Sequence, residues 1–415
     1  VMAGNRLDNN MQQFAMCYGG QQYGHWAGPL CDGRAINLGE VKNKLGQHWA
    51  LQLKGAGPTP YSRNADGRAV LRSSVREYLC SEAMHHLGVP TTRALSLIST
   101  GERVIRDMFY DGNPQYEPGA IVCRVAPSFI RFGNFEILAS RNRREHLQQL
   151  LDFTITTEFP FLGPPGRDNY LLWLAEICRT TALMIVEWLR VGFVHGVMNT
   201  DNMSIEGLTI DYGPFAMMDD FRYGYVCNHT DRAGRYAYGE QPNVSYWNLT
   251  MLSKALSPII DKDRMQKKLD DFGAFLYPDA YVDVMRDKLG LAIKFDDDVD
   301  LITDLVVALH DVYVDHTLFY RTLSRYDGIN KEPLYDIVME PVILDKWLNQ
   351  YDERLAQETR TQSQRQEAML KTNPKYVLKN YMLQEAISKA ESGDYSMVET
   401  LLFIAAHPYD ELPEF

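Results

Sequence analysis

The sequence predicts an α+β fold of two lobes, a strand-rich lobe over 1–130 and a mostly helical lobe over 131–415. Short stretches that alternate apolar and polar residues recur in the first part, as in half-buried strands. Beyond about residue 142 the apolar residues recur at helical spacing instead. A short polar segment around residue 200 follows a long helical stretch directly, as a binding loop does when it is carried by a helical scaffold.

The strands of the first lobe are predicted in chain order. A glycine-rich loop begins at residue 18 and leads into a strand at about 34–41. Residues 48–54 alternate Trp and Leu with polar side chains, which predicts a second strand. The glycines and proline at 55–58 end it. Further strands are expected at 93–98, 103–109 and 119–125.

Helices are predicted where apolar residues recur every three or four positions. The first lobe has one main helix, over about 75–87, which is expected to begin at a Ser73 or Ser74 cap. The chain after about residue 245 is mostly helical, with proline and glycine marking the turns. Two helices are expected at the start of the second lobe, over 142–158 and 168–191.

The composition limits the classes of function. The chain has 415 residues, of which 45% are hydrophobic and 23% are charged, as in ordinary globular proteins. It has no run of about 18 apolar residues, so we expect no membrane-spanning helix. The formal net charge of −12 argues against nucleic acid and anionic membranes as partners. A local basic pocket for phosphates is compatible with this charge.

Cysteine usage indicates a reducing compartment. The six cysteines form no C-x-x-C motif and do not cluster with the ten histidines, so neither zinc nor a disulfide framework is expected. We therefore expect a cytoplasmic protein. Because the chain begins with Val1, we expect a fragment or processed form, and a mitochondrial protein without its transit peptide is the alternative.

The segment from His195 to Asn202, with Asp211 nine residues later, has the spacing of the catalytic and metal-binding loops of protein kinases. Kinases carry H-R-D-L-x-x-x-N and then D-F-G at these places. The kinase catalytic base corresponds to Val197, which cannot accept a proton, whereas Asp201 lies beside Asn202. The pattern predicts a site that holds a nucleotide and its metal without ordinary kinase chemistry.

Other parts of a kinase site occur in kinase order. A glycine-rich loop precedes Lys54 at the end of a strand, and Glu77 follows on a helix. Taken singly, Lys54 is better explained as an edge residue and Glu77 as a surface carboxylate. Taken together with the 195–211 segment, they predict a kinase-like, two-lobed nucleotide-binding fold. Arg124 and Arg131 carry guanidinium forks that suit phosphate oxygens.

Asn202 and Asp211 are the candidate metal ligands. Both offer hard oxygen atoms, which suit Mg²⁺ or Mn²⁺ when phosphates and water complete the coordination. Singly, Asn202 could be a turn residue and Asp211 a cap. The predicted role of His195 is structural, since a buried histidine beside a loop most often holds that loop.

Several long runs together resemble one known family. They include Leu51-Gln-Leu-Lys-Gly-Ala-Gly57, Asp66-Gly-Arg-Ala-Val-Leu-Arg-Ser-Ser74, Arg131-Phe-Gly-Asn-Phe-Glu136, His195-Gly-Val-Met-Asn-Thr-Asp-Asn202 and Thr209-Ile-Asp-Tyr-Gly-Pro-Phe215. The sequence resembles the selenoprotein O family, also called YdiU-type proteins, over essentially its whole length.

This resemblance implies a pseudokinase fold that binds ATP in an orientation flipped relative to ordinary kinases. It implies transfer of AMP from ATP to Ser, Thr or Tyr hydroxyls of target proteins, with release of pyrophosphate. The alternatives are UMP transfer from UTP with Mn²⁺, residual kinase activity, and a non-catalytic nucleotide-binding scaffold. The implied partners are ATP and protein substrates.

The resemblance also implies roles for individual residues. Lys54 would contact phosphates and pair with Glu77, Asp201 would be the general base, and Asn202 and Asp211 would hold the metal. The nucleotide site would be lined by Cys31, Gly33, Arg34, Lys54, Asp66, Gly67, Arg124, Arg131 and Asp211.

One position departs from the pattern of the family. Its loop usually reads G-Q-L-G-D-G-R, and Cys31 stands here in place of the second glycine. If that position needs a positive φ, the Cβ of a cysteine costs about 1 kcal/mol. We keep Cys31 as a candidate backbone contact to the nucleotide.

Overall fold

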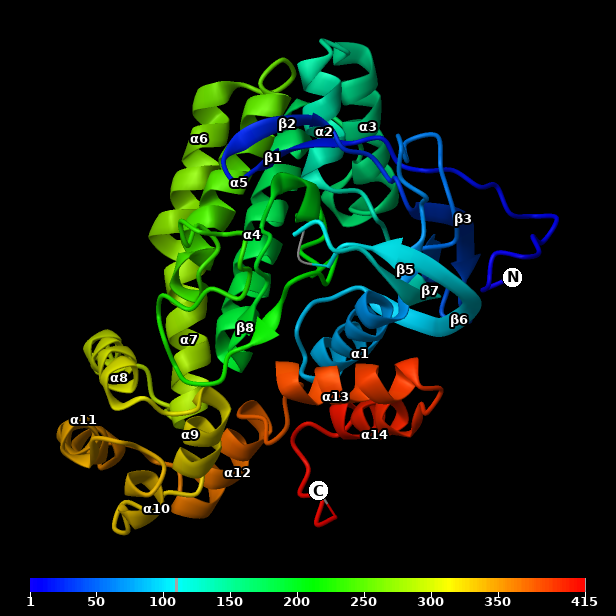
Figure 1. Cartoon of the computed structure of the whole chain (residues 1–415). Helices are drawn as coiled ribbons and strands as arrows, with labels where there is room; N and C mark the ends of the chain where they lie inside the picture. Colours follow the sequence, from blue (N-terminus) through cyan, green and yellow to red (C-terminus); the bar gives the residue numbers. More distant parts are fainter. Residues whose placement is uncertain (109–110, 415) are drawn as a thin grey trace.

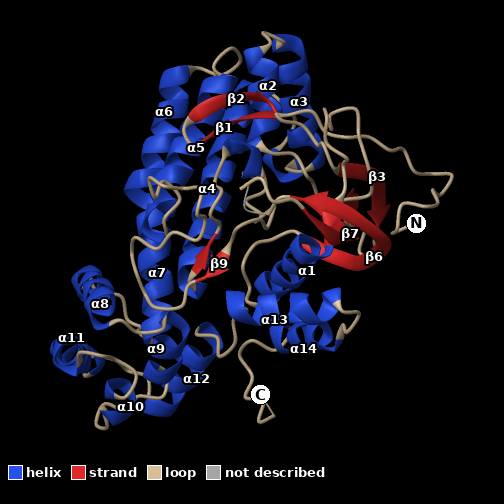
Figure 2. Ribbon diagram, in the orientation of Figure 1, coloured by secondary structure: helices blue, strands red, loops and turns tan. Residues whose placement is uncertain are grey.

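The computed structural model describes residues 1–108 and 111–414 (Figure 1). Its N-terminal part is rich in strands and its C-terminal part is helical, which confirms the predicted α+β, kinase-like class (Figure 2). The division between lobes at residues 130 and 131 stays a prediction, because the C-terminal helices pack back onto the first part of the chain.

Among the described residues, five strands form the main antiparallel sheet, in the order β3-β4-β7-β5 with β6 also paired to β7. Strands expected at 34–41 and 48–54 are confirmed to within one residue. The bounds are β3 (Ala35–Lys42), β4 (His48–Lys54), β5 (Ala69–Val70), β6 (Arg93–Arg106) and β7 (Gln115–Ala126).

The prediction of separate strands at 93–98 and 103–109 is wrong in one respect. Both belong to the single strand β6, whose pairing with β7 shifts in register between Ser99 and Arg103. The irregularity interrupts the alternation that the sequence shows, although the strand continues through it. The end of the predicted strand, Phe109, lies outside the described residues.

Helix α1 (Leu71–His86) carries Glu77 and begins earlier than predicted. Its cap is the extended residue Val70, and neither Ser73 nor Ser74 caps it. The Ser73 hydroxyl instead donates to the Val70 carbonyl, 3.0 Å away, from within the first turn. The reason is that β5 runs straight into the helix, so no loop remains for a side-chain cap.

Helix α1 contacts β6 and β7, and it also contacts the C-terminal helices α13 (Asn380–Glu391) and α14 (Ser396–Ala405). Figure 1 shows α13 and α14, in orange to red, beside α1. The element that presents Glu77 is thus held between the sheet and helices from more than 300 residues later in the chain.

A hairpin and a short helix close to the site were not predicted. Residues 18–33 contain an antiparallel hairpin of β1 (Gly19–Gln22) and β2 (His25–Pro29), and α2 (Phe132–Ser140) follows Arg131. The hairpin is rich in glycine and glutamine and lacks apolar alternation, so periodicity gives no strand signal there. Helix α2 is short, and its residues 132–137 are all buried. It therefore has no apolar face opposite a polar one, which is the pattern that predicts a helix.

The helical part is built around α4 (Arg167–Val191), whose tryptophans are fully buried and which ends at Gly192 in a left-handed conformation. The helices predicted at 142–158 and 168–191 are confirmed. The remaining helices are α3 (Arg144–Thr157), α5 (Gln241–Leu256), α6 (Lys262–Asp271), a π-helix (Phe272–Leu276), α7 (Tyr277–Leu289), α8 (Asp298–Val312), α9 (His316–Leu323), α10 (Glu332–Tyr335), α11 (Pro341–Leu355) and α12 (Gln362–Thr372). No helix in the described part of the chain is long and apolar enough to cross a membrane.

The segment after α4 forms the loop that the sequence singled out. Strands β8 (Phe193–Val194) and β9 (Ala216–Met217) pair with each other and hold the ends of the intervening stretch together. Within it, a short 3₁₀ turn over Thr200–Asn202 presents the polar residues. The two-stranded ribbon therefore fixes the loop against the end of α4.

Candidate functional site

A cavity of about 1170 Å³ lies between the sheet, α1 and the loop that follows α4. It brings together every predicted site residue except Arg131. The predicted residues that line it are Cys31, Gly33, Arg34, Lys54, Asp66, Gly67, Glu77, Arg124, Asp201, Asn202 and Asp211. Val197, which replaces the kinase base, also lines it.

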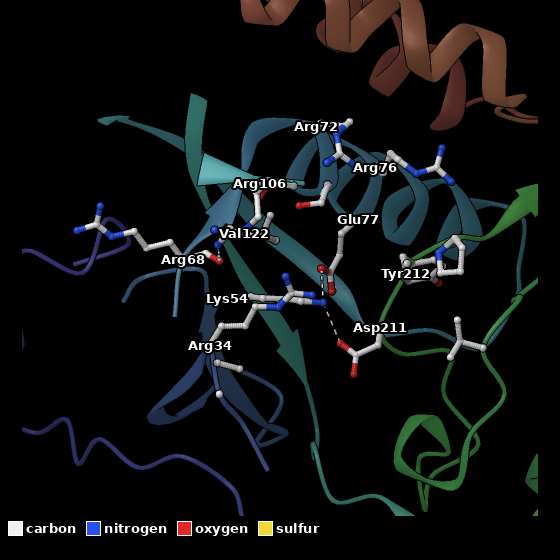
Figure 3. Close-up of a pocket in the computed structure, with 18 of the residues that line it drawn as sticks. Arg34, Lys54, Arg68, Arg72, Arg76, Glu77, Arg106, Val122, Asp211 and Tyr212 are labelled. Carbon is white, nitrogen blue, oxygen red and sulfur yellow. Dashed lines mark hydrogen bonds and ion pairs between the residues drawn. The ribbon is translucent and has the colours of Figure 1, made fainter. Parts of the chain in front are cut away.

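Lys54 links Glu77 and Asp211, two of the acidic residues that line the cavity. Its Nζ lies 2.7 Å from Glu77 Oε2 and 2.9 Å from Asp211 Oδ1 (Figure 3). These side chains come from the end of β4, from α1 and from the loop after β8. The pairing of Lys54 with Glu77 is the arrangement that the kinase-like order of the sequence predicts.

Asp211 is surrounded by cations on both carboxylate oxygens. Besides Lys54, Arg124 contacts Oδ1, and Arg131 Nη1 lies 2.7 Å from Oδ2. Burial alone would raise the pKa of Asp211, but Lys54, Arg124 and Arg131 outweigh it and hold that pKa well below its ordinary value. Asp211 is therefore a permanent anion. Arg131 is almost fully buried behind it and acts on the cavity through it.

His195 anchors the loop that follows α4. The side chain is buried, its Nε2 lies 2.9 Å from the Ile210 carbonyl oxygen, and its ring stacks on Trp188 at 5.4 Å between centroids. Burial lowers the pKa of His195, so the ring is neutral at pH 7. These contacts tie the start of the loop to the residue before Asp211.

Asp201 differs from Asp211 although both line the cavity. Burial raises the pKa of Asp201 to about 7, and the nearby Arg131 only partly offsets this. Its Oδ1 is buried and has no hydrogen-bond partner among the described residues. A carboxyl group whose pKa lies close to neutral is suited to accept a proton from a reacting group.

The two candidate metal ligands have oxygen atoms to spare. Asn202 Nδ2 donates to the Val197 carbonyl at 2.9 Å, which leaves Asn202 Oδ1 for a ligand. Asp211 has about four acceptor sites, of which the three cations use three. Within residues 1–108 and 111–414, no three His, Cys, Asp or Glu side chains gather as a metal cage. Two hard oxygens fit a divalent ion that phosphates help to bind.

Cys31 stands at a position whose backbone conformation favours glycine. Cys31 has a φ of 56°, in the left-handed region where a Cβ is unfavourable. Its backbone N–H donates to the Tyr18 carbonyl at 3.1 Å, so that N–H is already used within the protein. Gly33 approaches the Tyr61 carbonyl closely, and Arg34 is exposed at the cavity.

Asp66 and Gly67 also line the cavity, just before β5. Asp66 Oδ1 accepts from Arg106 Nη2 at 2.7 Å and from the Arg68 N–H at 3.0 Å. Gly67 has a φ of 66°, and a Cβ there would lie 2.2 Å from the Gly57 carbonyl oxygen. Only glycine fits this place.

The sequence reasoning missed other residues of the site. Gln52 is fully buried and accepts from Arg124 Nη2, while Arg76 donates to the Phe215 carbonyl at 2.6 Å and lies over the Phe215 ring. Burial lowers the pKa of Arg76. The sequence did carry a signal for Arg76: Arg72 and Arg76 are four residues apart on the helix that carries Glu77, so they lie on one face of it.

Comparison with known proteins decides the family. A sequence model described as "Protein adenylyltransferase SelO" matches residues 2–405. The chain belongs to this family. Proteins named "Protein nucleotidyltransferase YdiU" are similar along 100% of this chain and 82% of their own length. Those of Azoarcus sp. (strain BH72), Methylobacillus flagellatus and Xanthomonas axonopodis pv. citri are 53%, 52% and 52% identical.

The predicted family and enzyme class are thereby confirmed. The chain is a nucleotidyltransferase, with a nucleotide and a protein as its substrates and a divalent metal in its reaction. The cavity described above, lined by Lys54, Arg124, Asp201 and Asp211 among others, is the candidate site for that reaction.

Proposed function

We propose that this enzyme transfers AMP from ATP to Ser, Thr or Tyr hydroxyls of target proteins and releases pyrophosphate. The observation that carries the proposal is a single cavity that holds two kinds of acid. One is the ion cluster of Lys54, Glu77, Arg124 and Asp211. The other is Asp201, whose pKa burial raises to about 7. Val197 occupies the place of a kinase base, which speaks against transfer of the γ-phosphoryl group.

Lys54 and Arg124 are proposed to bind the phosphates that leave. Both face the cavity, and both are fixed by Glu77, at 2.7 Å and 3.1 Å respectively. Charge developing on a leaving pyrophosphate is stabilised best by donors that are already in place. Arg131 was expected to line the nucleotide site. We propose instead that it orients the Asp211 carboxylate, because it lies behind Asp211.

In the proposed step the hydroxyl oxygen of the target attacks the α-phosphorus. A new oxygen–phosphorus bond forms, the bond between the α-phosphorus and the bridging oxygen breaks, and pyrophosphate leaves with that electron pair. The hydroxyl proton passes to the Asp201 carboxylate. General-base help of this kind contributes roughly 10²–10⁴-fold in rate.

Asn202 and Asp211 are proposed to hold the divalent metal, either Mg²⁺ or Mn²⁺, since both ions favour carboxylate and amide oxygens. When bound, the ion neutralises phosphate charge and helps to orient the triphosphate. A non-catalytic scaffold would need neither this pair nor a proton acceptor, so their presence together supports an enzyme.

We also propose the class of target and the cellular compartment. The net charge of −12 supports a protein target rather than nucleic acid or an anionic membrane. Six free cysteines support a reducing compartment, for which we propose the cytoplasm, with a mitochondrion as the alternative.

The test uses ATP labelled at either the α- or the γ-phosphate, with Mg²⁺ and with dephosphorylated casein as a hydroxyl-rich acceptor. We expect label on casein from α-labelled ATP only, and none with the Asp211→Ala variant. Label from γ-labelled ATP only would mean kinase chemistry and would overturn the proposal. A parallel arm with α-labelled UTP and Mn²⁺ distinguishes AMP from UMP transfer.

A further inference from the structure

The β1–β2 hairpin is fastened to the catalytic loop just before Asp201. The Gln21 N–H donates to Thr200 Oγ1 at 2.7 Å. The Tyr23 N–H donates to the Tyr236 hydroxyl at 2.8 Å, and that hydroxyl donates to Asn199 Oδ1 at 2.6 Å. The hairpin thus holds residues 199 and 200, immediately before the proposed base.

A further contact reaches the start of the loop. Asn228 Nδ2 donates to the Tyr23 hydroxyl at 3.0 Å and to the Gly196 carbonyl at 3.1 Å. Figure 1 shows the hairpin, in dark blue, lying over the helical part of the chain rather than joining the main sheet. Its contacts are therefore with the loop and its surroundings.

Glycines allow the hairpin to lie against the proposed base itself. A Cβ on Gly20 would lie 2.7 Å from Asp201 Oδ1, and a Cβ on Gly133, in α2, would lie 2.1 Å from the Gly19 carbonyl oxygen. Contacts this short exclude any side chain, so strand β1 is pressed between the catalytic loop and α2.

The side chains beneath the hairpin expose little surface. Thr200 has no exposed surface and Asp201 is 8% exposed. Asp201 Oδ1 and Glu136 Oε2, the latter from α2, are both buried without a hydrogen-bond partner among the residues described. Unpaired buried carboxyl oxygens are costly in free energy, so the two at this point need an explanation.

We propose that the β1–β2 hairpin is a positioning element that fixes Asp201 and excludes water from it, so that a protein hydroxyl rather than water attacks the nucleotide. This inference rests on the proposed adenylyl transfer. The competing reaction is hydrolysis, in which a water oxygen bonds to the α-phosphorus, pyrophosphate leaves, the proton passes to Asp201, and free AMP results. A base reached only from the cavity side disfavours that reaction.

Three variants loosen the hairpin in different ways. Thr200→Val removes the acceptor of the Gln21 N–H at nearly constant volume, and Tyr236→Phe removes the hydroxyl between Tyr23 and Asn199. Gly20→Ala pushes β1 away from Asp201. Thr200→Ser, which keeps the hydroxyl, is the rescue variant. His25→Ala, at an exposed position of the same hairpin, is the matched control.

The measurement is the ratio of free AMP to AMP on casein, made with α-labelled ATP and Mg²⁺, together with the KM for ATP and the melting temperature. We expect the ratio to rise about ten-fold in the three loosened variants while KM changes less than about two-fold. His25→Ala and Thr200→Ser should give the wild-type ratio.

The loosened variants that fold could instead keep the wild-type ratio, with both products falling equally. That result would overturn the hairpin's role and leave adenylyl transfer intact. If the wild type labels no casein, the proposed function fails and the hairpin proposal fails with it. Because the Val and Phe substitutions remove only hydroxyl contacts, the test does not depend on Gly20→Ala folding.

Discussion

Asp201 and Asp211 line the same cavity ten positions apart, yet their surroundings push them in opposite directions. Asp211 receives Lys54, Arg124 and Arg131, and its pKa is held well below its ordinary value. Asp201 is buried beneath the hairpin with one oxygen unpaired, and burial raises its pKa to about 7. Two residues of one type are thereby prepared for a charged and a proton-accepting role.

The difference shows that burial alone does not set the character of an acid. Burial acts to raise the pKa of both carboxyl groups, so the cations in contact decide whether the charge persists. Separation of two acids in this way is a common basis for dividing metal binding from acid–base work.

Asp211→Asn should abolish metal-dependent transfer, a fall of about 10³-fold or more, because the charge facing the metal is lost. It should also lower the free energy of unfolding by about 3 kcal/mol, since three buried or half-buried cations lose their shared anion. Transfer assays and denaturant unfolding check both parts, with the exposed Asp263→Asn as control. Wild-type activity would remove Asp211 from the metal site.

Asp201→Asn should slow transfer by roughly 10²–10⁴-fold while ATP binding persists, because the proton acceptor alone is lost. Unlike the change at position 211, it should not lower the melting temperature at pH 8, since it replaces a buried carboxylate with a neutral amide of the same size. Calorimetry and a binding titration with ATP measure this. A loss of stability equal to that of Asp211→Asn would break the comparison.

Lys54→Ala should weaken ATP binding by roughly 1.5–3 kcal/mol, the usual worth of a hydrogen bond to a charged group. The expected cause is the loss of a cation that bridges Glu77 and Asp211 at the cavity. Isothermal titration with ATP and Mg²⁺ gives the affinity, and Lys42→Ala on β3, which is exposed, is the matched control. Equal affinities in the two variants would refute a phosphate role for Lys54.

Glu206 extends the comparison outside the cavity. Burial first, then the neighbouring Glu158, raise its pKa to about 8, while the Ser128 N–H donates to it at 3.2 Å. The folded state binds a proton that the unfolded state releases above about pH 4.3, so stability from this group falls as pH rises towards 8. Between pH 5 and 9, wild type should lose on the order of 2 kcal/mol relative to Glu206→Gln.

Denaturant unfolding at several pH values measures that loss, with the exposed Glu145→Gln as reference. Parallel pH profiles for wild type and Glu206→Gln would mean that Glu206 is ionised when folded, as a carboxylate paired with a cation would be. The result therefore tests whether contact with cations, rather than depth, separates Asp211 from the other buried acids.

The sequence by itself determined the kinase-like order of the site, because the spacing from His195 to Asn202 and Asp211 is local and survives without any knowledge of packing. It also determined the strand that ends at Lys54 and the long helix before the loop, since both repeat their apolar residues at a fixed period. Resemblance over the same runs supplied the family, which the comparisons confirm.

Only the tertiary structure decided what surrounds each aspartate. The position of Arg131 behind Asp211, the contact of Gln52 with Arg124, and the hairpin over Asp201 join residues 70 to 180 positions apart. Periodicity reports which face of an element is buried, but not which distant side chain meets it there. The charge state of a carboxyl group depends on those meetings, so it emerges only when the chain is folded.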